Sequence, residues 1–153
     1  VSVYEVNQLK KILTFFKPDI VQIPINILNQ NFLKNNFLKK IKKYGIEIHV
    51  RSVFLQGLLL ENNAFNFERI VNKKLDIIDK ICKKKRITRL NFLLSFINSI
   101  KEIDKIVIGI DSCLQLEKII KCMQKIILIK NYKNLAVSNL SIIDPRFWHN
   151  KNL

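Results

Sequence analysis

Glycine and proline are both scarce in this chain, with three of each among 153 residues. Their scarcity excludes collagen-like and linker-like sequences, which are rich in these residues. Charged residues are interspersed with apolar ones throughout, and 48% of the residues are hydrophobic. This composition is typical of a folded chain rather than a disordered one. The length is sufficient for the core of one ordinary domain.

Cysteine is also scarce, and the three cysteines have no CxxC spacing: Cys82, Cys113 and Cys122. An odd and irregular set favours neither a zinc site nor a disulfide framework, so we expect no metal ligands in this chain. Free thiols are typical of the reducing cytosol, and we expect a cytoplasmic protein.

Long hydrophobic runs are absent as well. The most apolar stretch, residues 90–100, is too short to span a bilayer. The first apolar run is interrupted by Glu5 and Lys10, unlike that of a secretory signal. We therefore expect no membrane partner.

Acidic residues are few: 12 Asp and Glu stand against 27 Lys and Arg, which gives a formal net charge of +15. Such a charge allows a polyanionic partner, and a basic nucleic-acid-binding module is one hypothesis. Base and phosphate recognition usually relies on arginine, however, and arginine occurs only at positions 51, 69, 86, 89 and 146. We interpret the lysines as solvated surfaces reflecting compositional bias and expect no nucleic acid partner. The charge would still assist capture of an anionic cofactor.

Hydrophobic periodicity predicts an alternation of strands and helices. The expected strands are 1–4, 20–25, 47–53 and 105–109, and the expected helices are 6–16, 33–44, 67–84, 88–99 and 111–123, with a polar loop at 61–66. Four alternating units predict right-handed crossovers and a parallel sheet, either small and open or half of an eight-stranded barrel. No Gly-x-Gly-x-x-Gly turn or Walker loop is present, which disfavours a Rossmann nucleotide site.

Local signals place several helix ends. Pro18 is expected to stop the helix at 6–16, and Gly45 is expected to end the helix at 33–44. Thr88 is a plausible N-cap for the helix at 88–99. Asp111 or Ser112 is expected to cap the last full helix.

Polar side chains mark the strand ends. Gln22 lies within the second strand, and Arg51, Ser52 and Gln56 follow the third. Ligands of parallel α/β folds bind at the carboxyl ends of the strands, so these residues predict a polar ligand there.

Four segments, in order, resemble the C-terminal half of the aldo/keto reductases. Residues 1–4 resemble the fifth barrel strand, Val21-Gln22 with Pro24 and Asn26 the sixth, residues 45–48 and 51–59 the seventh, and residues 107–117 the eighth strand and its helix. The resemblance implies an α/β fold that is the C-terminal half (strands 5–8) of a (β/α)8 TIM barrel. It would cover residues 1–130, with residues 131–153 as a tail packing on the barrel.

A narrower resemblance concerns residues 144–148, Asp-Pro-Arg-Phe-Trp, together with residues 51–57. These segments are similar to family members from surface-sugar biosynthesis. The similarity implies a small-molecule carbonyl substrate that is sugar-derived.

The family resemblance also implies a cofactor, NADPH, bound across the C-terminal strand ends. By position, Ser2 and Gln22 would bond the nicotinamide carboxamide, and Arg51 would replace an aromatic ring stacked on the nicotinamide. The remaining implied cofactor contacts are Ser52, Phe54 and Gln56 along the pyrophosphate loop, Gly109 at the eighth strand, and Ser112 and Gln115 near the adenosine.

Departures from the family pattern limit the cofactor assignment. Lys118 and Ile119 replace a Glu-Asn pair that often contacts the adenine, and no Lys or Arg directly follows Gly109. We expect NADP, with NAD as the alternative.

Structural roles are also open for these side chains. Gln22 could satisfy a buried backbone group, Arg51 could pair with Glu47 or Glu61, and Ser112 could be a plain helix cap. Trp148 is expected to pack the tail against the barrel.

The family's catalytic Asp, Tyr, Lys and His come from earlier strands, so we predict no catalytic residue in this chain. The expectation is a fragment of an NAD(P)H-dependent reductase, inactive alone. The alternative is a nicotinamide-nucleotide-binding pseudoenzyme or regulatory subunit. The first and fourth strands would be open edges, which favours self-association.

Overall fold

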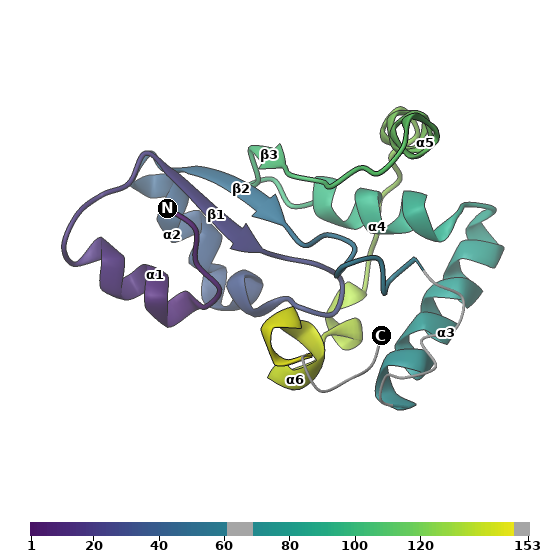
Figure 1. Cartoon of the computed structure of the whole chain (residues 1–153), viewed down its shortest axis with the longest axis horizontal. Coiled ribbons are helices and arrows are strands. Elements are labelled where there is room, and N and C mark those ends of the chain that lie inside the picture. Colours follow the sequence, from purple (N-terminus) through teal and green to yellow (C-terminus); the bar gives the residue numbers. More distant parts are fainter. Residues whose placement is uncertain (61–68, 149–153) are drawn as a thin grey trace.

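A three-stranded parallel sheet lies at the centre of the computed structural model, which describes residues 1–60 and 69–148 (Figure 1). Its order is β1 (Ile20–Pro24), β2 (Glu47–Arg51) and β3 (Lys105–Ile106). The alternate β-branched side chains of β1 and β2 are fully buried, whereas Gln22, His49 and Arg51 between them are only half-buried, so the core lies against one face of the sheet. The predicted parallel topology is confirmed, whereas the loop predicted at 61–66 lies outside the described residues.

The strand predicted at residues 1–4 is reduced to a single parallel bridge between Ser2 and Gln22. The Val3 N–H donates to the Gln22 carbonyl over 3.1 Å, and the Gln22 N–H donates to the Val1 carbonyl over 2.7 Å. The segment therefore lies beside β1 in the predicted order, but the chain enters α1 immediately afterwards and ends the pairing.

The strand predicted at residues 105–109 is also shorter than expected, since β3 ends at Ile106. Its neighbour β2 leaves the sheet at Ser52, whose φ of 60° is left-handed. The last sheet hydrogen bond runs from the Val107 N–H to the Val50 carbonyl, over 2.7 Å. Residues 108–109 consequently have no strand to pair with.

Helices surround the sheet, and the α-helices are α1 (Val6–Leu13), α2 (Phe37–Lys43), α3 (Arg69–Lys85), α4 (Arg89–Asn98), α5 (Cys113–Met123) and α6 (Leu140–Ile143). The 3-10 helices are η1 (Asn31–Asn36), η2 (Tyr132–Leu135) and η3 (Pro145–Phe147). Among the described residues, none of these helices has the length and apolar character needed to cross a bilayer.

The single helix predicted over residues 33–44 is wrong in its first half. Asn35 and Asn36 have φ values of 55° and 54°, which break the helix into η1 and α2. Asparagine accepts this left-handed conformation more readily than most residues. The predicted end is confirmed, because Gly45 has a φ of 72° directly after α2.

The helix predicted at residues 6–16 ends early, at Leu13. The Thr14 hydroxyl donates to the Lys11 carbonyl over 2.7 Å and competes with the helical pattern. Leu9 is buried, whereas Phe16, which lies beyond the end of the helix, is 54% exposed.

The end of the chain packs across the fold in residues 131–148. The Val137 N–H donates to the Leu28 carbonyl over 2.9 Å, and the Tyr132 ring lies edge-on to Phe96 with 4.9 Å between centroids. Trp148 is buried, whereas Phe147 is exposed. This segment brings α6 and η3 close to the carboxyl ends of the strands.

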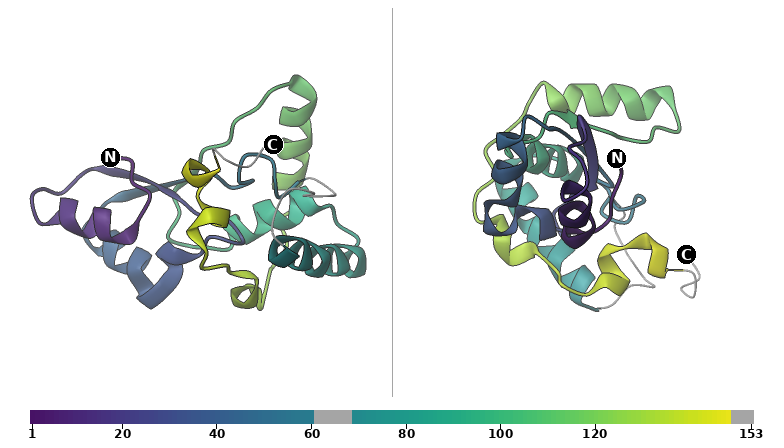
Figure 2. Two further views of the ribbon diagram at one scale, coloured as in Figure 1. Left: turned by 60° about the horizontal axis from the view of Figure 1, so that its bottom comes forward. Right: turned by 90° about the vertical axis from the view of Figure 1, so that its left-hand side faces the viewer.

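Helix α5 projects from one end of the molecule (Figure 2). None of its residues is buried, and its large apolar side chains are exposed, including Leu114 at 60% and Ile120 at 49%. The helix is anchored at its C-terminal end, where the Asn91 amide of α4 donates to the carbonyls of Cys122 and Lys125.

Candidate functional site

A pocket of about 500 Å³ lies where β2 and β3 end and α5 begins. We refer to it as the β3–α5 pocket. Its lining includes Ser52, Phe54, Gln56, Gly109 and Gln115, all of which the sequence predicted as cofactor contacts. Residues far apart in the sequence thus meet at one carboxyl edge of the sheet, the usual ligand position of parallel α/β folds.

The wall after β2 is a chain of tight turns. Ser52, Leu55, Gln56 and Gly57 all have positive φ values, between 48° and 86°. The Leu55 side chain is fully buried and fixes the loop, while Phe54 and Gln56 line the pocket. Non-glycine residues in this conformation carry strain, which is characteristically found at ligand sites.

The opposite wall is the N-terminus of α5. The Ser112 hydroxyl accepts a hydrogen bond from the Gln115 N–H over 3.3 Å, which confirms Ser112 as the N-cap. The Gln115 side-chain oxygen accepts from the Asp111 N–H over 2.9 Å. The positive end of the helix dipole, at this terminus, is suited to an anionic group.

Gly109 borders open space. A Cβ atom built at this glycine would have no heavy atom within 4 Å. Any side chain here would extend into free volume that the pocket now offers to a ligand. The β3–α5 pocket therefore has free volume beside Gly109, within a mainly apolar lining that also carries the polar side chains named above.

Lys118 also lines the β3–α5 pocket, one helical turn after Gln115. Lys118 departs from the family pattern, and the sequence predicted no ligand contact for it. The three-residue separation from Gln115, which puts both side chains on one helix face, was the signal that could have identified it.

Ser2 and Gln22 lie apart from this pocket. They form the backbone bridge between the first segment and β1, and neither lines the β3–α5 pocket. Gln22 is half-buried within β1. Their predicted carboxamide contacts thus stay predictions, without support from the pocket's lining.

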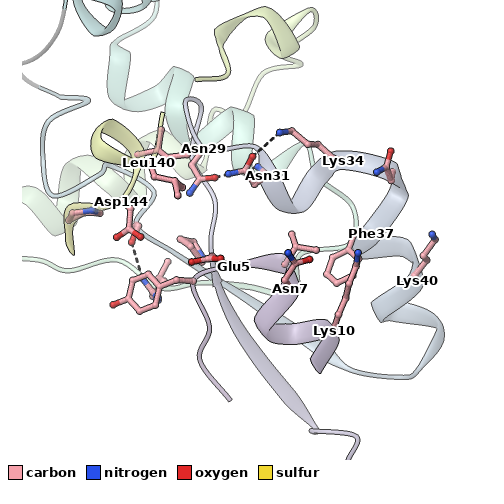
Figure 3. A pocket seen from close by; sticks show the side chains of 18 residues that line it. Glu5, Asn7, Lys10, Asn29, Asn31, Lys34, Phe37, Lys40, Leu140 and Asp144 are labelled. Atoms are coloured by element: carbon pink, nitrogen blue, oxygen red, sulfur yellow. Dashed lines mark hydrogen bonds between the residues drawn. The ribbon is translucent and has the colours of Figure 1, made fainter. Parts of the chain in front are cut away.

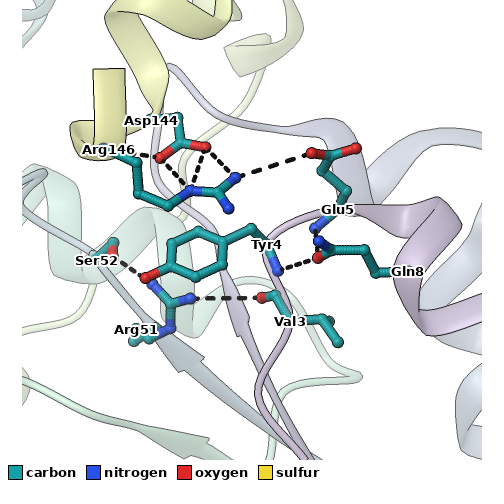
Figure 4. Close-up of polar contacts among 8 residues, drawn as sticks. All are labelled: Val3, Tyr4, Glu5, Gln8, Arg51, Ser52, Asp144 and Arg146. Atoms are coloured by element: carbon teal, nitrogen blue, oxygen red, sulfur yellow. Dashed lines mark hydrogen bonds and ion pairs between the residues drawn. The ribbon is translucent and has the colours of Figure 1, made fainter. Parts of the chain in front are cut away.

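Arg51 contacts an aromatic ring. Of the two carboxylates considered as its partners, Glu47 is paired elsewhere and Glu61 lies outside the described residues. Its guanidinium carbon lies 4.2 Å from the centroid of the Tyr4 ring, and its Nη1 donates to the Ser52 hydroxyl over 3.3 Å (Figure 4). Glu47 instead contacts His49 at 2.8 Å and Lys105 at 3.1 Å. Arg51 Nε is buried and has no hydrogen-bond partner within residues 1–60 and 69–148.

A second guanidinium lies on the same ring. The Arg146 guanidinium carbon is 3.7 Å from the Tyr4 centroid, so Tyr4 lies between two cations (Figure 4). Arg146 Nε donates to both carboxylate oxygens of Asp144 over 3.0 Å. Burial raises the pKa of Asp144, but the hydrogen bonds from Arg146 outweigh it and the net pKa is lowered.

Comparison with known proteins places these features in a family. The Aldo/keto reductase family model matches residues 1–137. Among curated proteins, no sequence matches significantly.

Solved aldo-keto reductases have a similar fold. The holo form of AKR11C1 from Bacillus halodurans aligns with a TM-score of 0.71 at 16% identity, over 90% of this chain and 49% of that one. Thermostable Tm1743, in complex with the inhibitor epalrestat, aligns with a TM-score of 0.61 at 15% identity, over 88% and 46%. The glycerol dehydrogenase AKR11B4 from Gluconobacter oxydans aligns with a TM-score of 0.53 at 13% identity, over 86% and 50%.

These identities establish similarity of fold alone, and this chain spans about half the length of the structures that it matches. The family model, by contrast, covers most of the chain. The parallel sheet, the pocket at its carboxyl edge and this match lead to one conclusion: the chain belongs to the aldo/keto reductase family.

Proposed function

We propose that this chain is the cofactor-holding, C-terminal half of an NADP-dependent reductase that acts on a small carbonyl compound. The observation that carries the proposal is the β3–α5 pocket, which is lined by five of the nine cofactor contacts that the family resemblance implies. Carbonyl reduction by this family uses hydride from the nicotinamide ring. The protein's contribution is to hold and orient the cofactor.

The pocket's residues fit the anionic part of a dinucleotide. Ser52 and Gln56 offer polar groups on the strained loop, and the N-terminus of α5 offers a favourable dipole for the pyrophosphate. The free volume beside Gly109 allows the cofactor backbone to approach closely. The adenosine would lie toward Gln115.

The choice between NADP and NAD rests on two opposed charges in the same lining, Lys118 and Asp111. A lysine favours the 2′-phosphate of NADP, whereas an aspartate favours the free ribose hydroxyls of NAD. Asp111 lies just before the N-cap of α5, whereas Lys118 lies within the helix and lines the pocket with its charged side chain. We therefore give Lys118 the greater weight and assign NADP.

Proton transfer to the carbonyl oxygen requires a general acid, which we assign to a tyrosine outside this chain. Tyr4 is stacked between two guanidiniums, and Tyr132 packs against Phe96. Tyr44 is the C-cap of α2 and lies near the start of β2, away from the carboxyl edge of the sheet. The chain alone is therefore expected to bind cofactor without reducing carbonyl compounds. The three free thiols agree with a cytoplasmic setting for the intact protein.

The open edges of the sheet imply a protein partner. The edge next to β3 carries exposed Val107 and the apolar surface of α5, and the edge next to β1 carries exposed Val1 and Ile20. We propose that the other half of the barrel covers both edges in the intact enzyme. When the chain is alone, a second copy would cover them.

The test is a titration of the chain with NADPH, followed by the fluorescence of the reduced nicotinamide. A Gly109→Val variant would fill the pocket without clashing with the protein, because no atom lies within 4 Å of the added Cβ. We expect at least a tenfold weaker affinity for this variant. The matched control is Gln124→Val at the exposed C-cap of α5, which leaves the pocket unchanged.

Equal NADPH affinity for both variants and the parent chain would overturn the assigned pocket. The upstream reading frame separates the enzyme from its alternative. A barrel half with Asp, Tyr, Lys and His at its strand ends supports the reductase. One that lacks the Tyr or the Lys supports a nucleotide-binding regulatory subunit.

A further inference from the structure

A second pocket, of about 390 Å³, lies between α1, η1, α2 and the segment that contains α6 (Figure 3). We call it the asparagine pocket, because Asn7, Asn29, Asn31 and Asn35 all line it. It shares Ser52 with the β3–α5 pocket, but its other walls belong to different elements. The proposed dinucleotide site does not account for it.

Cationic side chains gather at one end of the asparagine pocket. Lys10 comes from α1, Lys34 from η1 and Lys40 from α2 (Figure 3). In residues 1–60 and 69–148, no ion pair within 4.0 Å involves any of these three ammonium groups. Lys34 Nζ donates a hydrogen bond to Asn31 Oδ1 over 2.8 Å. Three lysines from three elements, without a carboxylate partner among the described residues, favour an anionic ligand group.

The carboxylates at the other end do not oppose this charge. Glu5 and Asp144 line the pocket, and both are within ion-pair distance of Arg146. Arg51 lines the same end, and its buried Nε has no hydrogen-bond partner in the part of the chain that the structure describes. The pocket is therefore cationic overall, and one guanidinium still has hydrogen-bonding capacity.

The amides supply the second kind of recognition. Each asparagine side chain carries both a donor and an acceptor, which matches the hydroxyl groups of a polyol. Asn29 is buried, and its Oδ1 accepts from the Asn31 N–H over 3.3 Å, so part of this wall is fixed in place. The left-handed Asn35 turns the chain so that η1 and α2 both contribute to the wall.

Apolar side chains complete the pocket. Phe37, Pro24 and Ile143 are buried and line it. A surface of this kind accepts the carbon faces of a sugar ring. The volume also lies within the range of small-molecule sites.

We propose that the asparagine pocket binds a six-carbon sugar that carries a phosphate or carboxylate group. The anionic group contacts the lysine end, and the hydroxyls bond to the asparagines. Arg51 and Ser52, at one end of the asparagine pocket, are also residues that the family resemblance assigns to the cofactor, whereas the lysines and asparagines that carry this proposal are not.

The experiment is isothermal titration of the 153-residue chain with glucose 6-phosphate, glucuronate, inorganic phosphate and glucose. We expect at least one of the two anionic sugars to bind at least tenfold more tightly than both phosphate and glucose. Equal binding of inorganic phosphate, or no saturable binding of either anionic sugar, would overturn the proposal.

Variants locate the binding. Lys34→Gln with Lys40→Gln, and separately Asn7→Ala, should each weaken anionic-sugar binding about tenfold. Lys39→Gln, on the same helix but outside the lining, is the matched control. All these side chains are exposed, and circular dichroism verifies folding. Equal affinities across the pocket variants and the control would contradict the assignment.

A crossed comparison separates this site from the proposed cofactor site. Gly109→Val should leave sugar binding unchanged, and the lysine variants should leave NADPH binding unchanged. Loss of sugar binding in Gly109→Val would place the sugar in the β3–α5 pocket and overturn the inference. Failure of NADPH binding alone would affect only the proposed function.

Discussion

Asn91 of α4 holds the end of α5 through Cys122: the side-chain amide nitrogen donates to the Cys122 carbonyl over 3.2 Å. The same nitrogen donates to the Lys125 carbonyl over 3.0 Å. Carbonyls at a helix end lack partners within the helix, and a buried amide supplies them here. Since α5 buries no side chain of its own, this contact has a large share in setting its position.

Asn91→Ala should therefore act on the β3–α5 pocket from a distance. We expect unfolding by urea to show a loss of about 1–3 kcal/mol, because buried hydrogen-bonding groups lose their partner. NADPH affinity should fall severalfold as α5 shifts. Asn98→Ala, at the exposed end of α4, is the control. Unchanged NADPH affinity in Asn91→Ala would show that α5 is positioned by other contacts.

Lys118→Glu tests the choice of cofactor. Reversal of this charge should weaken NADPH binding at least tenfold, because the 2′-phosphate would meet a carboxylate, while NADH binding should change by less than threefold. Comparative fluorescence titrations with the two nucleotides provide the measurement. Equal losses for NADPH and NADH would assign Lys118 to a part of the cofactor that both share.

Asp144→Asn tests the contact with Arg146. A carboxylate with a lowered folded-state pKa stabilises the protein above its unfolded pKa of about 4, and this stabilisation disappears as pH falls through the folded value. We expect the variant to be about 1–2 kcal/mol less stable at pH 7, with the difference shrinking below about pH 4. Urea unfolding at several pH values measures it.

The control for that experiment is Asp76→Asn, an exposed carboxylate on α3. If the free energies of unfolding of Asp144→Asn and the parent chain differ by the same amount at every pH, the charge of Asp144 does not contribute to stability. The same result would leave the stacking of Arg146 on Tyr4 as the main function of that arginine.

Thiol reactivity should separate two of the cysteines. Burial raises the pKa of Cys82 to about 11, with a further increase from Asp79. At pH 8 only about one thousandth of this thiol is ionised, whereas Cys113 is exposed on α5. Iodoacetamide should therefore label Cys113 first, as followed by mass spectrometry. Equal labelling rates would mean that α3 does not stay packed on the core.

The sheet was predictable because its signals are local. The buried β-branched residues of β1 and β2 recur at every second position and lie on one face of the sheet, a periodicity that the sequence displays directly. Gly45 and Thr88 likewise act within one turn of their own position. Predictions of this kind need no knowledge of the distant chain.

The site was only partly predictable because it depends on distant contacts. Ser52 has a left-handed φ, which ends β2 and shortens β3. A serine in the sequence does not indicate this conformation. The helix breaks at Asn35, although the lysine-rich helical pattern of the sequence continues on both sides of this residue. The stacking of Arg51 on Tyr4 depends on strand order and on the segment that carries Arg146, neither of which a periodicity can reveal.

The exposed apolar surface of α5 has a consequence for colloidal behaviour. At low ionic strength, a formal charge of +15 keeps copies of the chain apart. Added salt screens that repulsion, with a Debye length of about 3 Å at 1 M, and leaves the attraction between surfaces such as Leu114 and Ile120. Self-association of the chain should consequently increase as ionic strength rises. Most complexes of basic proteins with anionic partners behave in the opposite way, because salt weakens them.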